Sequence, residues 1–401
     1  MADCEPAPVA GIRLAAVSAG IKTSGRLDLV LFELAPACAV AATFTRNAFC
    51  AAPVQVAREN LQATTPRYLL INTGNANAGT GDEGIAAARA CCQALAGRVG
   101  LESAAVLPFS TGVIGEHLPV ELIEAALPAA LEGLSADNWS QAAAGILTTD
   151  TRPKGASREL EIDGKPVMVT GIAKGAGMIR PNMATMLAFV ATDAAVEETL
   201  LQSLWGEIVE HSFNRVTVDG DTSTNDAAIV IATGLAGNAV IDSCEHRDYP
   251  VLRDALQSLT LALAQALVRD GEGASKFVAI EVCEGGSEAE CLEIAYTIAH
   301  SPLVKTALFA GDPNWGRILA AIGRAEVDDL EVNRIQLRIN GVLIAEGGCR
   351  ADSYTEEQGV EAMRPGDITI EVRLQRGECR STIWTSDLSY DYVRINAEYR
   401  S

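Results

Sequence analysis

The stretch from Gly171 to Val190, GIAKGAGMIRPNMATMLAFV, decides the fold, because a glycine-rich approach leads directly into an apolar segment. Glycine permits backbone conformations that other residues avoid. The second half, Met186–Val190, is continuously apolar and predicts a strand buried on both faces. Thr185 stands at the junction between the two halves.

A chain break between Ala184 and Thr185 would make Thr185 an N-terminal nucleophile. Its hydroxyl can attack the preceding carbonyl through a five-membered ring, and water then opens the ester to release an α-amine. Such an amine has a pKa of about 7.7–8.0, so near neutral pH it can accept the hydroxyl proton itself. The alternative is that Thr185 is an ordinary β-branched residue entering a strand.

Apolar strands alternate with helical patterns on both sides of this stretch. Strands are predicted at Leu27–Leu34, Ala39–Thr45, Tyr68–Asn72, Met186–Thr192, Ala227–Thr233 and Phe277–Val282. Helices are predicted at Ile85–Val99, Val196–Val209 and Leu252–Val268. Elements of both kinds pack as layers around a shared core, so the fold class is mixed α/β.

The chain after Gly285 shows a clearer alternation of apolar and polar residues. Ile335–Ile339 and Ile368–Leu374 each predict a strand with one exposed face. Asn340-Gly341 predicts a tight hairpin, since a type I′ turn needs positive φ at both central positions. We expect a core domain over residues 1–285 and a smaller α/β domain over residues 286–401.

The composition describes a globular protein and restricts its partners. Of its 401 residues, 48% are hydrophobic and 21% charged, and the net charge is −21. That charge argues against nucleic acid and anionic membranes, which would repel the chain. The first residues are acidic and lack a basic segment followed by an apolar one, and no run approaches the about 18 apolar residues of a membrane span. We therefore expect a cytoplasmic protein.

The spacing of cysteine, histidine and acidic residues gives little support for a metal site. The ten cysteines form no CxxC pair, and the four histidines have no ligand spacing, so reduced thiols and no zinc are expected. The acidic loop that starts at Asp219 fails the calcium-loop test, because its sixth position is Thr224 and its twelfth is Val230. A hydrogen-bonded turn in which Asp219 or Asp226 supports the site is favoured instead.

Several long motifs together resemble one family, the glutamate N-acetyltransferases (ornithine acetyltransferases), which are self-cleaving enzymes of arginine biosynthesis. The resemblance extends from Ala19 to the last residue. The motifs are residues 72–78 (NTGNANA), 110–115 (STGVIG), 148–154 (TTDTRPK), 174–187 (KGAGMIRPNMATML), 213–226 (FNRVTVDGDTSTND), 271–274 (GEGA), 314–317 (NWGR) and 395–401 (INAEYRS).

The resemblance implies a layered αββα sandwich like that of N-terminal-nucleophile hydrolases, with a second, smaller α/β domain. It also implies cleavage between Ala184 and Thr185 into chains 1–184 and 185–401, two copies of each forming a heterotetramer. Thr185 would be the nucleophile, with Thr111 and Gly112 forming the oxyanion hole. Taken alone, Ser110-Thr111-Gly112 is more typical of a turn or a helix cap, so the oxyanion role rests on the resemblance.

The resemblance further places substrate contacts at Thr151, Lys174, Thr185, Glu272, Asn396 and Ser401. Lys174 would suit an amino-acid carboxylate, and Glu272 the side-chain ammonium of ornithine. Their alternatives are a solvated surface lysine and an exposed loop glutamate. The contacts at Asn396 and Ser401 require the C-terminal tail to fold back onto the site. Arg317 fits either a carboxylate clamp or a structural role.

The implied reaction moves acetyl from N-acetylornithine to glutamate through an acetyl-Thr185 ester and needs no cofactor. The residues leave open whether acetyl-CoA is also a donor. One alternative is a self-processed aminopeptidase or amidase, in which water accepts the acyl group. A second is a non-catalytic binding protein, although such a protein would not need Thr185, Thr111 and Gly112 together.

Overall fold

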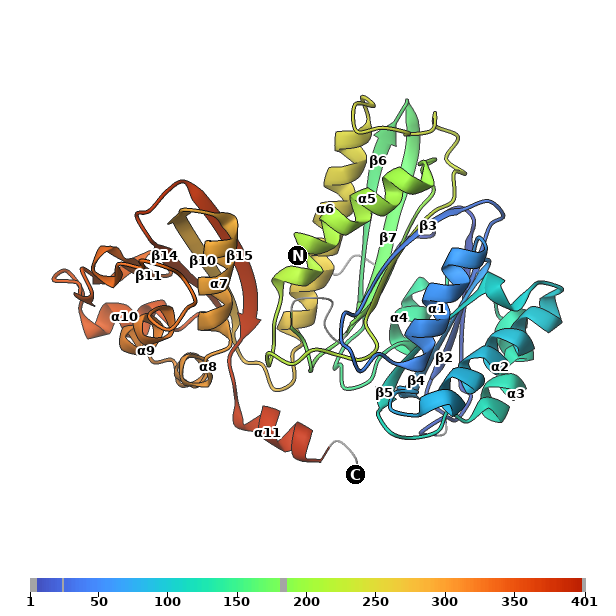
Figure 1. Cartoon of the computed structure of the whole chain (residues 1–401), viewed down its shortest axis with the longest axis horizontal. Helices are drawn as coiled ribbons and strands as arrows, with labels where there is room; N and C mark the ends of the chain where they lie inside the picture. The colour runs from blue at the N-terminus through green and yellow to red at the C-terminus, as the bar shows by residue number, and fades with distance from the viewer. Residues whose placement is uncertain (1–5, 24, 181–185, 399–401) are drawn as a thin grey trace. The chain divides into compact units, whose positions relative to one another are not determined.

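The computed structural model describes residues 6–23, 25–180 and 186–398 (Figure 1). The chain forms two compact units that interleave along the sequence. Unit 1 comprises residues 1–175, 181–214 and 221–267, and unit 2 comprises residues 176–180, 215–220 and 268–401. Each contains strands and helices, as expected for a mixed α/β protein. The expected division at residue 286 stays a prediction, and these units divide the chain differently.

Unit 1 contains two sheets. The first has the order β1-β2-β4-β5 and the second the order β3-β9-β8-β7-β6. Their strands are β1 Ile12–Val17, β2 Leu29–Leu34, β3 Ala39–Phe44, β4 Tyr68–Asn75, β5 Val106–Val113, β6 Lys154–Ile162, β7 Lys165–Lys174, β8 Leu187–Thr192 and β9 Ala227–Ala232. The helices are α1 Ala52–Ala63, α2 Gly81–Val99, α3 Val120–Glu132, α4 Trp139–Gly145, α5 Glu198–Glu210 and α6 Tyr249–Arg269, whose last turn enters unit 2.

The two sheets of unit 1 face each other across an apolar core. Phe32 of β2 and Phe189 of β8 lie 5.3 Å apart between ring centroids within this core. The neighbouring Leu31 points to the opposite face, as a strand requires, and packs in a second cluster with Leu95 of α2. Trp205 of α5 donates to the carbonyl of Ala228 on the outer side of the other sheet. The layers are therefore α, β, β and α.

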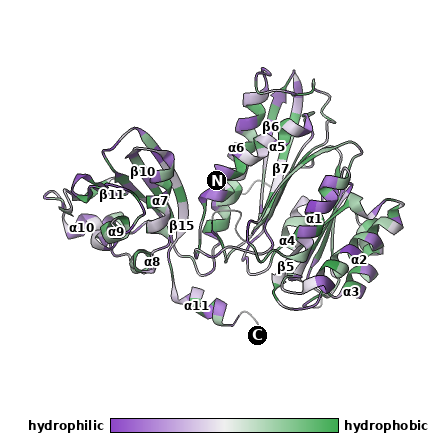
Figure 2. Ribbon diagram, in the orientation of Figure 1, coloured by the Kyte–Doolittle hydropathy of each residue, from purple (hydrophilic) through white to green (hydrophobic). Residues whose placement is uncertain are grey.

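Helix α6 is long and apolar enough, by length and composition alone, to span a membrane, which differs from the sequence expectation. It packs as a core helix, however. The side chains of Leu259 and Leu263 lie against Gly171 of β7, where an added Cβ would meet both. The leucines that α6 buries recur every three or four residues, at Leu252, Leu256, Leu259, Leu263 and Leu267. Figure 2 shows the same mixture of polar and apolar positions on this and other helices.

Unit 2 is built on a six-stranded sheet with the order β13-β12-β11-β14-β10-β15. Its strands are β10 Phe277–Gly285, β11 Gln336–Ile339, β12 Val342–Glu346, β13 Cys349–Arg350, β14 Asp367–Arg373 and β15 Cys379–Ser386. Its helices are α7 Glu288–Ala299, α8 Pro302–Ala310, α9 Trp315–Ile322, α10 Glu356–Ala362 and α11 Tyr390–Ala397. The predicted hairpin joins β11 to β12, and Asn340 and Gly341 have φ of 45° and 82°, which confirms positive φ at both positions.

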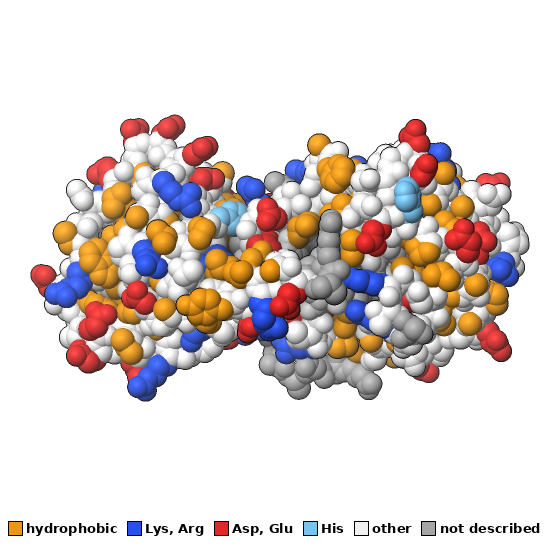
Figure 3. Space-filling model, turned by 90° about the horizontal axis from the view of Figure 1, so that it is seen from below, with side chains coloured by type: hydrophobic (Ala, Val, Ile, Leu, Met, Phe, Trp, Pro, Cys, Tyr) orange, Lys and Arg blue, Asp and Glu red, His pale blue; other side chains and the backbone are white. Residues whose placement is uncertain are grey.

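Charged side chains of the described residues are dispersed over one face of the molecule. On the face shown in Figure 3, lysine and arginine side chains alternate with acidic and apolar ones and do not gather into one basic patch. This distribution agrees with the net charge of −21 in giving nucleic acid no basic surface on that face.

Candidate active site

Lys174 and Thr111 meet inside unit 1, although 63 residues separate them in sequence. Lys174 ends β7, Thr111 lies near the end of β5, and both side chains are buried. The Lys174 ammonium donates to the hydroxyl of Thr111 at 3.2 Å and to that of Thr148 at 2.8 Å. The interpretation of Lys174 as a solvated surface lysine is therefore wrong.

Gly112 follows Thr111 within β5, so the interpretation of this motif as a turn or a helix cap is also wrong. Its φ is 139°, a conformation that side chains rarely adopt. A Cβ at this position would lie 2.3 Å from the carbonyl carbon of Gly74 on the neighbouring strand β4. Only glycine fits at this place, because the backbone of Gly74 and Asn75 fills the space that a side chain would need.

Asp150 organises the base of this cluster. Its Oδ1 accepts the backbone N–H of Gly175 at 2.7 Å and the ammonium of Lys154 at 2.6 Å, and its Oδ2 lies 4.0 Å from Lys174 Nζ. Burial alone would raise the pKa of Asp150, but Lys174, Lys154 and the Gly175 N–H together lower it to about 2. Asp150 therefore remains a carboxylate that holds two lysines and the start of the glycine-rich loop.

A second group of bonds fixes the strand that follows the predicted cleavage point. The N–H of Met186, immediately after Thr185, donates to Asp226 Oδ1 at 2.9 Å, and the carbonyl of Met186 accepts from the N–H of Ala227 at 3.2 Å. Asp226 is fully buried, and burial raises its pKa well above the usual range despite its hydrogen bonds. The Asp226 side chain thus accepts a backbone hydrogen bond at the end of the β8–β9 pairing, where a strand carbonyl would otherwise be needed.

Asn225 joins the two sheets of unit 1 beside this ladder. Its amide nitrogen donates to the carbonyl of Ala76 at 2.7 Å and to that of Ser110 at 2.9 Å. Ser110 directly precedes Thr111 and donates to Asn72 at 2.5 Å. Asn225 therefore ties the entrance of β9 to the strand that carries the predicted oxyanion donors.

In unit 2, Glu272 and Asn396 are in direct contact. Glu272 Oε2 accepts from Asn396 Nδ2 at 2.7 Å, and the Glu272 N–H donates to the carbonyl of Ala176 at 2.8 Å. A Cβ on Gly177 would meet the Glu272 carboxylate at 2.4 Å, so the glycine makes room for it. Glu272 is buried, and its interpretation as an exposed loop glutamate is wrong.

Helix α11 is attached to the same part of unit 2. The hydroxyl of Ser389 donates to the carbonyl of Gly273 at 2.6 Å, and that of Tyr392 donates to Asp219 at 3.1 Å. Asp219 in turn accepts the N–H groups of Met178 and Ile179 at 2.6 and 3.0 Å. Asp219 therefore links the glycine-rich segment to α11, which fits the predicted hydrogen-bonded turn.

The remaining predicted residues differ in how the structure places them. Thr151 is exposed beside Asp150. Arg317 donates to the carbonyl of Leu303 at 2.9 Å, which favours its structural role. Ala184, Thr185 and Ser401 lie outside the described residues. The sequence analysis assigned no role to Thr148, Asp150 or Asn225. All three lie within the quoted family motifs, and that membership was the signal that could have identified them.

Over residues 6–23, 25–180 and 186–398, no group of three or more histidine, cysteine or acidic side chains is placed to hold a metal ion. The cysteines in these ranges are free thiols. Burial raises the pKa of Cys38 and Cys291 to about 11.

Known proteins resemble this chain along nearly its whole length. The model of the ArgJ family matches residues 13–401. The arginine biosynthesis bifunctional protein ArgJ of Pseudomonas syringae pv. tomato is 58% identical over 98% of this chain and 97% of its own length, and that of Methylococcus capsulatus is 55% identical over 100% and 98%. A crystal structure of the Bacillus halodurans ArgJ protein is 39% identical, covers 53% of this chain and 98% of its own, and has a TM-score of 0.49. The resemblance inferred from the motifs is confirmed: the chain belongs to the ArgJ family, acetyltransferases of arginine biosynthesis.

Proposed function

We propose that this chain transfers acetyl from N-acetylornithine to glutamate through a covalent ester on Thr185. In the first half, the Thr185 hydroxyl attacks the acetyl carbonyl, its proton passes to the α-amine and on to the leaving nitrogen, and ornithine departs. In the second half, the α-amine of glutamate attacks the ester, which regenerates Thr185 and gives N-acetylglutamate. Both halves pass through a tetrahedral oxyanion.

The observation that carries the proposal is the bond from Lys174 to Thr111. The Thr111 oxygen accepts from the ammonium, so its own proton remains available for a developing oxyanion. A hydroxyl that accepts from a cation is also polarised toward donating. Beside it, the backbone N–H of Gly112 would be the second donor. This arrangement would stabilise the negative charge that develops on the tetrahedral oxyanion.

The remaining assignments complete the proposal. Lys174, Thr151, Glu272, Asn396 and Ser401 would bind the amino-acid substrates, and the Glu272 carboxylate would suit an ammonium group. The contact between the buried Glu272 and the exposed Asn396 supports a role for the tail in forming that subsite. Cleavage at Ala184–Thr185, a heterotetramer of two α and two β chains, and a cytoplasmic site of action belong to the same proposal.

Acetyl-CoA is proposed as a second donor, which would also make this chain an N-acetylglutamate synthase. The proposal rests on the word bifunctional in the names of the relatives at 58% and 55% identity. An assay with glutamate and acetyl-CoA, in the absence of N-acetylornithine, tests it directly. Formation of N-acetylglutamate supports two donors, and its absence restricts the chain to the exchange reaction.

Partition of a labelled acetyl group separates this function from that of an amidase. The enzyme is supplied with acetyl-labelled N-acetylornithine, and the label is measured in N-acetylglutamate and in free acetate as glutamate is raised. We expect label in N-acetylglutamate to dominate and parallel lines in double-reciprocal plots, as a ping-pong scheme requires. Acetate formed at the same rate with and without glutamate would instead identify a hydrolase.

A further inference from the structure

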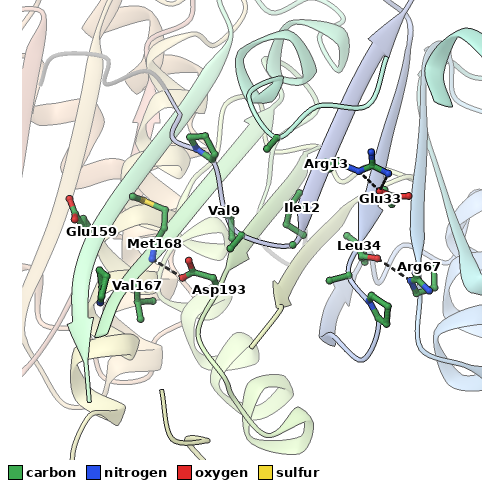
Figure 4. A pocket seen from close by; sticks show the side chains of 17 residues that line it. Val9, Ile12, Arg13, Glu33, Leu34, Arg67, Glu159, Val167, Met168 and Asp193 are labelled. Atoms are coloured by element: carbon green, nitrogen blue, oxygen red, sulfur yellow. Dashed lines mark hydrogen bonds and ion pairs between the residues drawn. The ribbon is translucent and has the colours of Figure 1, made fainter. Parts of the chain in front are cut away.

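Unit 1 contains a cavity of about 770 Å³ that no part of the proposed reaction uses. Its volume lies within the range of small-molecule sites, roughly 300–1,000 Å³. Figure 4 shows Val167 and Met168 of β7 on one side and Leu34 of β2 on the other, with Val9 between them. Val9 and Leu34 are buried, so much of the wall is apolar.

The cavity lies at the far end of the strands from the Lys174–Thr111 cluster. Met168 lines the cavity near the start of β7, whereas Lys174 ends the same strand. Six residues of extended chain separate them, which is roughly 20 Å. Likewise, Arg67 lines the cavity directly before β4, whereas the other end of β4 pairs with Thr111. The two sites are therefore distinct.

Two half-buried groups of opposite charge line this cavity without a charged partner in the described part of the chain. Asp193 is half-buried; its Oδ1 accepts the Met168 N–H at 2.8 Å, and no described lysine or arginine pairs with it. Arg67 donates through Nε to the Leu34 carbonyl at 3.0 Å and pairs with no described carboxylate. A third charge on the wall, Arg13, is already paired with Glu33.

Desolvated charges without partners are costly, and a ligand of matching charge would offset that cost. Burial raises the pKa of Asp193, and no neighbouring cation opposes the shift. Asp193 belongs to the turn after β8 and Arg67 to the segment before β4 in the other sheet, so the two charges come from opposite layers (Figure 4). An apolar surface lies between them.

We propose that this cavity is a binding site for a small zwitterion, an amino acid in the broad sense, with its ammonium at Asp193 and its carboxylate at Arg67. The apolar surface of Val9, Leu34 and Val167 contacts the hydrocarbon body. The exposed Glu159 at the rim adds negative charge on the ammonium side.

Calorimetric titration of the intact protein with ω-amino acids of increasing length tests the site. The probes are 4-aminobutanoate, 6-aminohexanoate and 8-aminooctanoate, compared with hexylamine and hexanoate, each of which lacks one charge. We expect one zwitterion to bind at least about tenfold more tightly than either singly charged probe, since a charge-assisted hydrogen bond contributes that much. Equal binding of hexylamine or hexanoate would overturn the assignment without any variant.

Variants of the two charged residues test whether the probe binds in this cavity. Asp193→Asn keeps an oxygen for the Met168 N–H but removes the charge, and Arg67→Met removes the guanidinium; each should weaken the best probe by about tenfold or more. Asp163→Asn, an exposed acidic position of the same unit, is the matched control and should bind as wild type does. Thr111→Ala should also leave binding unchanged. Loss of binding in Thr111→Ala, or its persistence in folded Asp193→Asn and Arg67→Met, would place the probe elsewhere.

Discussion

The ammonium nitrogen of Lys174 lies 3.2 Å from the hydroxyl oxygen of Thr111, with both side chains buried. An ammonium can only donate, so the direction of this bond is fixed. A lysine expected to hold a substrate carboxylate is thus also positioned to strengthen the predicted oxyanion donor. Asp150 Oδ2 lies 4.0 Å from the same ammonium nitrogen and helps to hold Lys174 in this place.

Replacing Thr111 by alanine should slow acetyl transfer by roughly 10²–10³-fold with little change in apparent substrate affinity, because one oxyanion donor is lost. The rate is measured on protein whose cleavage is complete by mass spectrometry, so that processing does not limit activity. Thr111→Ser, which keeps the hydroxyl, is the control and should retain most activity. A rate within about threefold of wild type for Thr111→Ala would show that the hydroxyl is not used.

Lys174 should act partly through Thr111, and a double-mutant cycle measures how much. Lys174→Met and Thr111→Ala are assayed singly and together for kcat/KM. Residues in one hydrogen-bonded network are non-additive, so the double variant should lose less than the product of the two single losses. Lys174→Met should also raise KM if the ammonium binds a carboxylate. Fully multiplicative losses would mean that the 3.2 Å contact carries no catalytic coupling.

Self-cleavage is the prediction that lies outside the described residues. Denaturing mass spectrometry should show two chains, 1–184 and 185–401, and Thr185→Ala should give one chain without transferase activity. Thr185→Ser should cleave and transfer more slowly, because its hydroxyl and its new α-amine remain. Fully active enzyme recovered as a single intact chain would exclude Thr185 as an N-terminal nucleophile.

Local patterns predicted the buried strands well, because period-two and continuous apolar runs depend only on neighbouring residues. Strand β8 was predicted at Met186–Thr192 and is observed at Leu187–Thr192. The strand β5 was not predicted, since its Pro108 and the Ser110-Thr111-Gly112 motif favour turns. Pairing with β4 over its whole length outweighs those preferences.

The sequence could not show which polar residues meet. Lys174 and Asp150 lie 24 positions apart, and Asn225 contacts a carbonyl 115 positions away, so tertiary folding decides both contacts. Burial likewise depends on packing, which is why local composition favoured an exposed Glu272 and the structure buries it against Gly177. The family motifs identified the segments that form the site, whereas only the folded structure shows which residues of those segments contact one another.

Asp150 should make stability depend on acid pH. Its pKa in the folded protein is about 2, below the unfolded value near 3.9, so its contribution is complete above about pH 5 and is lost as pH falls toward 2. Asp150→Asn should therefore lower the melting temperature at pH 7, with a cost on the order of 2–3 kcal/mol, and the deficit should shrink below pH 4. Asp137→Asn, an exposed change, is the control. A deficit independent of pH would contradict the ionic role.

Two substitutions of Asp226 distinguish the effect of its hydrogen bond to Met186 from the effect of its charge. Asp226→Asn keeps an oxygen that can accept from Met186, whereas Asp226→Ala leaves that buried N–H without a partner, at about 1–3 kcal/mol. We therefore expect Asp226→Ala to melt lower and to cleave and transfer slowly, and Asp226→Asn to retain both activities.

The contribution of Asp226 to stability should change with pH in the opposite direction to that of Asp150. Burial raises the folded pKa of Asp226, so wild type loses stability as pH rises above the unfolded value of about 3.9 toward the folded one. Asparagine does not ionise, so Asp226→Asn should gain melting temperature relative to wild type between pH 4 and pH 8. Melting curves of the two proteins across that range decide the matter. If the melting temperatures of the two proteins change in parallel with pH, the pKa of Asp226 is not raised by burial. If Asp226→Asn folds but is inactive, activity needs the charge of Asp226 and not only its hydrogen bond to Met186.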